Sequence, residues 1–251
     1  PSHAGAAIRA YPHLGNPALV NEAPHGVNQT LWPSAASLNF IEAAFHHACS
    51  LFPSPTIHIG GATTDWAPWE SDSSLIRAGL TSGAAIERLF IDRALRTLHF
   101  HGRRAAAWDS LTKAYPTPPP GTTLLAHRPG NAGRRAAESS GAPWVLADAG
   151  ILTLSHPGRT NSPLEPAHAL FDNLTHALRG ERLKGVEAVA WSSTVTTPDI
   201  LFYHLLPRLL VIAEAAWHGE DSLPWDKLAP LVEQEMAHLR RSVPYWNPQR
   251  P

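Results

Sequence analysis

Apolar positions along the chain repeat with two periods, one typical of amphipathic helices and one typical of short buried strands. From residue 37 to 51 the apolar side chains are spaced by three and four, which predicts one apolar helix face: Leu38, Ile41, Phe45, Ala48 and then Phe52. Pro53 follows and ends this helix. Residues 84–98 predict a second helix, with these positions near the helical period: Ile86, Leu89, Phe90, Arg93 and Leu98.

Short runs of β-branched and apolar residues predict five strands, at 56–59, 103–108, 122–126, 144–147 and 186–191. Gly60 and Gly61 close the first of them in a tight turn. Further helices are predicted at 131–140, 198–217 and 226–241, the second of these capped by Thr197 and kinked at Pro207. Strands that alternate with helices favour an α/β fold with a parallel sheet.

Long loops are predicted at 115–121, 128–134 and 155–166, each after a strand or a short helix. In parallel α/β proteins the loops that follow strands carry the functional site. We therefore expect the chemistry of this chain at the carboxyl ends of its strands.

Composition narrows the class of protein. The chain has 251 residues, a formal net charge of −1 and 43% hydrophobic residues, which suits one large or two small folded domains. The near-neutral charge gives no electrostatic case for nucleic acid, and no apolar run reaches the roughly 18 residues of a membrane span. A single cysteine, Cys49, excludes an intrachain disulfide framework and a multi-cysteine metal site.

Several residue types still invite functional interpretations. Nine tryptophans fit either a packed core or a platform for partly apolar ligands such as sugars. The histidines at 46, 47, 99 and 101 suggest a metal site, but the chain lacks a His-Glu-x-x-His spacing, so we predict no metal and no cofactor. Glycosylation sequons begin at Asn28 and Asn173.

Five segments, in order along the chain, resemble glycoside hydrolase family 20, the β-N-acetylhexosaminidases. Residues 52–61 (Phe-Pro-Ser-Pro-Thr-Ile-His-Ile-Gly-Gly) resemble the family's fourth barrel strand, and residues 102–109 resemble its Gly-Arg-Arg-x-x-x-Trp-Asp strand. Residues 185–192 are similar to the last barrel strand, residues 197–217 to the final long helix, and residues 1–14 to the Pro-Gly-His-x and Tyr-Pro-x-Leu segments.

The resemblance implies a partial (β/α)8 TIM barrel of about five parallel strands, strands 4 to 8, with outer helices. On this alignment residues 1–251 form a single, N-terminally incomplete barrel domain, and three strands with the family's sugar-gripping arginine lie outside it. The family acts on glycans that contain N-acetylhexosamine, and its eukaryotic members are secreted or lysosomal. The oligomeric state stays open.

The family's chemistry depends on an Asp-Glu pair directly after His-Ile-Gly-Gly. The substrate's own N-acetyl oxygen attacks the anomeric carbon, the Asp orients the acetamido group, and the Glu protonates the leaving oxygen. Ala62 and Thr63 occupy these two catalytic positions here, and neither can ionise or hold a proton of useful pKa. The resemblance therefore implies a homologue with impaired or lost catalysis.

Other family positions are partly retained. His3, Trp108 and Trp191 match substrate-binding positions, the two tryptophans being those that wall the acetamido pocket and stack on the sugar ring. His127 stands at the family's aromatic after strand 6, and Ser193 at the glutamate after the last-strand tryptophan. The tyrosine and aspartate of the loop after strand 7 align loosely with these residues: Ile151 or Thr153, and Ser155.

Three hypotheses follow. The first is a hexosaminidase homologue that has lost its catalytic pair. The second is an active hexosaminidase in which another carboxylate, such as Asp65, Glu70 or Asp109, has taken over. The third is a non-catalytic sugar-binding or interaction module that uses the remaining tryptophans. A pocket with two carboxylates about 5 to 10 Å apart favours the second, and a pocket with tryptophans and no carboxylate favours the third.

Overall fold

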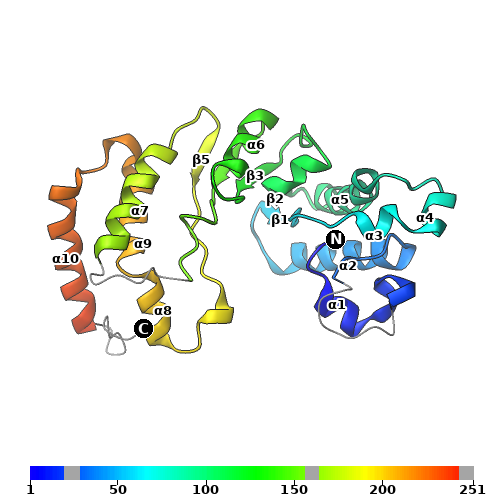
Figure 1. Cartoon of the computed structure of the whole chain (residues 1–251), viewed down its shortest axis with the longest axis horizontal. Coiled ribbons are helices and arrows are strands. Elements are labelled where there is room, and N and C mark those ends of the chain that lie inside the picture. Colours follow the sequence, from blue (N-terminus) through cyan, green and yellow to red (C-terminus); the bar gives the residue numbers. More distant parts are fainter. Residues whose placement is uncertain (20–28, 156–163, 243–251) are drawn as a thin grey trace. The chain divides into compact units, whose positions relative to one another are not determined.

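The computed structural model describes residues 1–19, 29–155 and 164–242, and the chain divides into two compact units (Figure 1). Unit one comprises residues 1–125 and 139–143, and unit two comprises residues 126–138 and 144–251. The single-domain assignment stays a prediction, and each unit is described by itself below. Asn28 lies outside the described residues, whereas Asn173 is exposed on a helix.

The five strands follow chain order in the sheet, β1-β2-β3-β4-β5, with these bounds: β1 Thr56–His58, β2 Arg104–Trp108, β3 Thr123–Ala126, β4 Trp144–Leu146 and β5 Leu183–Val186. In unit one β2 pairs in parallel with β1, where Ile57 is opposite Ala105, and with β3. In unit two β4 and β5 are parallel. The predicted α/β fold with five parallel strands is confirmed. The last strand begins three residues earlier than predicted, and only an isolated bridge between Thr153 and Val189 continues its pairing.

The helices of unit one are α1 Gly5–Ala10, α2 Ala35–Leu51, α3 Ala67–Glu70, α4 Ser73–Arg77 and α5 Gly83–Phe100, and short polar side chains cap α2, α4 and α5. Ser34 and Ser82 cap α2 and α5 by accepting hydrogen bonds from backbone N–H groups three residues later, and Asp72 caps α4 in the same way. Both long helices were predicted from their apolar periodicity to within two residues.

Helices α2 and α5 pack on one face of strands β1 and β2. Cys49 of α2 and Leu98 of α5 contact Ile57 and Ala105, which are opposite each other in the two strands. A second apolar cluster of unit one gathers these buried side chains: Ile8, Leu14, Leu31, Trp32, Trp69, Leu75, Ile86 and Phe90. Two positions of the predicted helix faces lie outside the core, because Leu89 is 37% exposed and Phe52 is 58% exposed.

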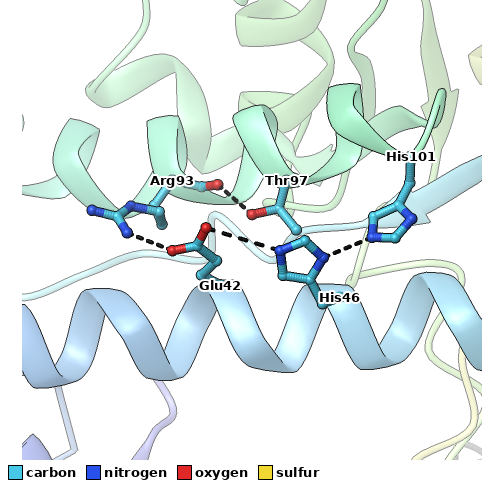
Figure 2. Close-up of polar contacts among 5 residues, drawn as sticks. All are labelled: Glu42, His46, Arg93, Thr97 and His101. Carbon is cyan, nitrogen blue, oxygen red and sulfur yellow. Dashed lines mark hydrogen bonds and ion pairs between the residues drawn. The ribbon is translucent and has the colours of Figure 1, made fainter.

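A polar network also joins α2 to α5 (Figure 2). Arg93 Nη1 lies 2.5 Å from Glu42 Oε2, and the other Glu42 oxygen lies 3.9 Å from His46 Nε2. His46 Nδ1 is 2.7 Å from His101 Nε2, so one of these rings donates to the other. This contact links the carboxyl-terminal part of α2 to the residue that follows α5. No three His, Cys, Asp or Glu side chains among the described residues are grouped closely enough to hold a metal ion.

The remaining helices are α6 Ala132–Ser140, α7 Leu164–Ala177, α8 Pro198–Leu205, α9 Arg208–His218 and α10 Trp225–Ser242, and the short 3₁₀ turns are η1 Pro12–Leu14, η2 Pro17–Leu19, η3 Asp109–Lys113, η4 Ser192–Thr194 and η5 Gly219–Asp221. The predicted helix at 198–217 is two helices, because Pro207 separates α8 from α9 and has no N–H to continue the ladder. Helix α7 was not predicted, and its start lies within the loop expected at 155–166.

In unit two, α7 packs against α9, and α9 also contacts β5. The ring of Trp225 in α10 stacks on His168 of α7 with centroids 4.4 Å apart. Buried apolar side chains on the three helices form this core: Leu170, Phe171, Leu174, Val211, Ile212, Ala215, Leu228, Val232 and Met236.

Among the described residues, no single helix is long and apolar enough to cross a bilayer. Helix α8 and the stretch Arg208–Asp221 reach that length and apolarity only together, as a pair bent by 46°.

Neighbouring residues of α5 give a matched test of this core. Phe90 is 2% exposed and stacks on Trp69, whereas Leu89, one residue earlier, points outward. We expect Phe90→Ala to lower the free energy of unfolding by about 3–5 kcal/mol, because it leaves a cavity. Leu89→Ala should change it by less than about 1 kcal/mol. Urea unfolding followed by circular dichroism measures both, and similar losses would contradict the assigned face.

Candidate functional site

The turn after β1 places the two catalytic positions of the resemblance. Ile59 N–H donates to Ala106 C=O, and Gly60 C=O accepts from Trp108 N–H, so pairing with β2 continues for two residues beyond the end of β1. Gly60 and Gly61 then adopt φ of 85° and 76°. A Cβ on Gly61 would lie 3.3 Å from the Leu111 side chain. Glycine is therefore required for both the turn and its close approach to η3.

Ala62 and Thr63 lie directly after this turn, beyond the carboxyl end of β1. The Thr63 hydroxyl is 3.0 Å from Ser110 Oγ, and Ser2 Oγ donates to the Ala62 carbonyl at 3.4 Å. Thr63 is exposed and Ala62 is half-buried. Thr63 is thus accessible, but the only polar group on the two side chains is the Thr63 hydroxyl, which already has Ser110 as a partner.

The buried side chain of Glu87 in α5 holds the segment that follows Thr63 through two hydrogen bonds. Glu87 is 3% exposed, and its two carboxyl oxygens accept hydrogen bonds from Thr64 Oγ1 at 3.0 Å and from Trp66 Nε1 at 2.6 Å. A Cβ on Gly83 would come within 2.3 Å of the Trp66 side chain, so the glycine leaves space for that indole. The role of Glu87 was not predicted from the sequence, although a carboxyl group next to Ile86 on the apolar face of a helix could have indicated that it is buried.

Of the three carboxylates of the second hypothesis, Asp65 and Glu70 accept backbone hydrogen bonds and Asp109 is buried. Asp65 is exposed and accepts a hydrogen bond from Ala67 N–H at the start of α3. Glu70 accepts from Gly83 N–H at 2.8 Å. Asp109 is fully buried at the start of η3. Together with Glu87, these groups support the loop and the helices around it.

His3 and Trp108, the other predicted site residues of unit one, differ in how firmly they are held. Trp108 ends β2, is half-buried, and its ring contacts His58 edge-on with centroids 4.8 Å apart. His3 is exposed and adopts a φ of 58°, which is uncommon outside glycine. The indole of Trp108 is therefore placed by a strand, whereas His3 is placed by a local turn.

Trp191 is the predicted site residue of unit two. Its indole is 48% exposed and follows β5, directly before η4. Its backbone N–H donates to Ser155 Oγ at 2.6 Å, and Ser155 is fully buried. Leu154 N–H donates to Val189 C=O at 2.7 Å, and Val189 N–H donates to Leu152 C=O at 2.9 Å. These hydrogen bonds join the segment that leads to Trp191 to residues 152–155 and hold the backbone from which the indole extends.

Three polar side chains of unit two follow the strands β3, β4 and β5: His127, Asp148 and Glu187. His127 Nδ1 is 3.0 Å from Ala147 C=O. Asp148 is buried and accepts from Gly150 N–H at 2.7 Å. Loss of hydration raises the pKa of the Glu187 carboxyl, and the nearby His127 opposes this shift.

Comparisons with known proteins place the chain. The family model described as glycosyl hydrolase family 20, catalytic domain, matches residues 1–220. A curated β-N-acetylhexosaminidase of Cellulomonas fimi is 36% identical over 67 residues, which cover 27% of this chain and 12% of that protein.

Solved structures of the same family share the fold. An exo-β-N-acetylglucosaminidase of Vibrio harveyi, solved with N-acetylglucosamine, is 22% identical with a TM-score of 0.80 over 100% of this chain and 43% of its own. A β-N-acetylhexosaminidase of Streptomyces coelicolor is 22% identical with a TM-score of 0.76 over 100% of this chain and 52% of its own. The chain therefore spans about half the length of these structures.

The five parallel strands and the surrounding helices agree with these comparisons. Because the family model covers most of the sequence, the resemblance first seen in short motifs holds along nearly the whole chain. The chain belongs to glycosyl hydrolase family 20.

Proposed function

We propose that this chain is a catalytically impaired member of its family that retains part of a surface for N-acetylhexosamine. The observation that carries the proposal is the segment after β1. Its two residues, Ala62 and Thr63, offer no ionisable group, and the carboxyl groups of Asp65, Glu70 and Glu87 accept hydrogen bonds from other residues. The substrate class comes from the family.

The expected loss of rate is large. Removal of a general acid lowers the rate by roughly 10² to 10⁴. Loss of a group that stabilises developing charge lowers it by roughly 10² to 10³ more, by analogy with an oxyanion-hole donor. The combined factor of about 10⁴ to 10⁷ is a large part of the roughly 10⁶ to 10¹⁷ that enzymes supply. Glu87 cannot replace the pair without giving up Thr64 and Trp66.

Related structures support a separation of turnover from sugar binding. A Vibrio harveyi enzyme in which one aspartate is replaced by alanine is described as inactive. Streptomyces plicatus β-hexosaminidase variants with an aspartate replaced by alanine or by asparagine are described in complex with the product N-acetylglucosamine. Loss of a carboxylate in this family is therefore compatible with a bound amino sugar.

Non-catalytic sugar recognition is the second candidate function, and the exposure of Trp191 favours it. An indole that is half exposed at a strand end offers a flat apolar face for the C–H groups of a pyranose ring. Its hydrogen-bonded backbone keeps that face in place before any ligand arrives.

Activity is tested with an aryl N-acetyl-β-glucosaminide, using the Streptomyces coelicolor enzyme as the positive control. We expect this chain to release no aryl alcohol above the buffer rate, because no carboxylate is available at Ala62 or Thr63. Asp65→Ala and Asp72→Ala form a matched pair, since both aspartates accept helix-start N–H groups. Turnover that disappears in Asp65→Ala but not in Asp72→Ala would establish the second hypothesis.

Sugar recognition is tested by titration with N-acetylglucosamine, followed by NMR of the labelled protein. We expect Trp191→Ala to weaken binding by roughly 3- to 10-fold, the effect of losing one aromatic stacking contact. Trp217→Ala is the control, because Trp217 is 86% exposed on α9. Equal effects of the two substitutions, or no saturable binding by the unsubstituted chain, would rule out recognition by Trp191.

A further inference from the structure

Arg208 is a buried cation that no proposed function yet uses. It is the first residue of α9, and only 7% of its surface is exposed. One guanidinium nitrogen, Nη2, donates to Leu154 C=O at 2.6 Å and also contacts His204 C=O. Within the described residues no carboxylate forms an ion pair with it. Its polar contacts there are thus made to backbone carbonyls rather than to an opposite charge.

A buried guanidinium without a paired carboxylate is an unfavourable choice for stability alone. The charge loses its hydration, and carbonyl dipoles compensate only part of that loss. Burial accordingly lowers the pKa of Arg208, with Tyr203 acting in the opposite direction. A buried apolar side chain of similar length would fill the same space without this penalty. The position of the Leu154 carbonyl is therefore the feature that arginine specifically controls.

The Leu154 carbonyl lies one residue from the group that holds Trp191. Leu154 and Ser155 are consecutive and buried, and Ser155 Oγ accepts the Trp191 N–H. The Leu154 N–H is bound to Val189 C=O on the segment that leads to Trp191. Arg208 fixes the other side of the same residue. A shift of Leu154 would be passed to Trp191 through two hydrogen bonds.

We propose that Arg208 is a positioning residue for the Trp191 indole and acts through Leu154 and Ser155. The proposal deepens the sugar recognition proposed above and rests on it for its functional consequence. It assigns a positioning role to a buried residue on α9. The guanidinium sets the angle of the exposed ring, and the ring sets the geometry of stacking.

The test uses the full chain labelled with 5-fluorotryptophan and examined by fluorine NMR without sugar. Trp191→Phe identifies the Trp191 resonance among the nine tryptophans. We expect Arg208→Met to move or broaden that resonance strongly, since Leu154 C=O loses its donor. Arg208→Lys, which keeps one cationic donor, should give a smaller change. Ser155→Ala should affect the same resonance, because it removes the acceptor of the Trp191 N–H.

Internal controls separate positioning from general loosening of unit two. The resonances of Trp144, which is 1% exposed, and of Trp217, which is on the same helix as Arg208, should stay in place. Arg179→Met is the matched control substitution, because Arg179 forms an exposed ion pair with Glu220. It should leave the Trp191 resonance unchanged.

Two results would overturn the proposal. The first is an unchanged Trp191 resonance in folded Arg208→Lys and Ser155→Ala variants. The second is an equal shift of the Trp191, Trp144 and Trp217 resonances in the same variants. If Arg208→Met does not fold, as far-ultraviolet circular dichroism reveals, these two milder variants decide.

The sugar-binding readout is separate. Arg208→Lys should weaken N-acetylglucosamine binding by less than Trp191→Ala does, roughly 2- to 5-fold. Failure of the unsubstituted chain to bind sugar overturns the proposed recognition alone, because the fluorine measurement contains no ligand.

Discussion

Parallel backbone hydrogen bonding is the constraint from which the positions of all candidate residues follow. Parallel strands begin and end at the same edges of their sheet, so the residues after each strand gather at one edge. In unit one this places Ala62 and Thr63 after β1, next to Trp108 at the end of β2, through the bond from Trp108 N–H to Gly60 C=O. In unit two it places Ser155 against Trp191.

The segments that follow the strands are also held by hydrogen bonds to buried charged or ionisable side chains. Glu87 holds the segment after β1 through Thr64 and Trp66, and Arg208 holds the segment after β4 through Leu154. Both side chains come from helices and are more than nine-tenths buried. Irregular backbone cannot satisfy its own polar groups as a helix does, so it needs such fixed partners when it is buried.

Family membership and chemistry therefore have different physical bases in this chain. The fold needs strand pairing, apolar helix faces and the two glycines at positive φ, and all of these are present. On the function proposed above, the reaction needs ionisable groups at two adjacent positions, where this chain has a methyl group and a hydroxyl. Fold and chemistry can separate in this way because a few side chains at a loop contribute little to the core.

Much of the fold could be predicted from the sequence because its signals are local. Apolar spacing located α2 and α5, β-branched runs located four strands closely, and Gly60-Gly61 located the turn. Helix α7 was missed and β5 was placed too late, since their apolar patterns are weaker and partly interrupted by polar residues. Pro207 was expected to bend a helix, whereas the lost N–H ends one helix and begins another.

The site was predictable only where a side chain's own chemistry decides its role. That Ala62 and Thr63 cannot ionise follows from the sequence alone, whatever surrounds them. The roles of Glu87 and Arg208 required the tertiary structure, because their partners lie 21 to 54 residues away along the chain. Burial turns an ordinary charged side chain into a fixed support, and burial depends on contacts between segments that no local pattern encodes.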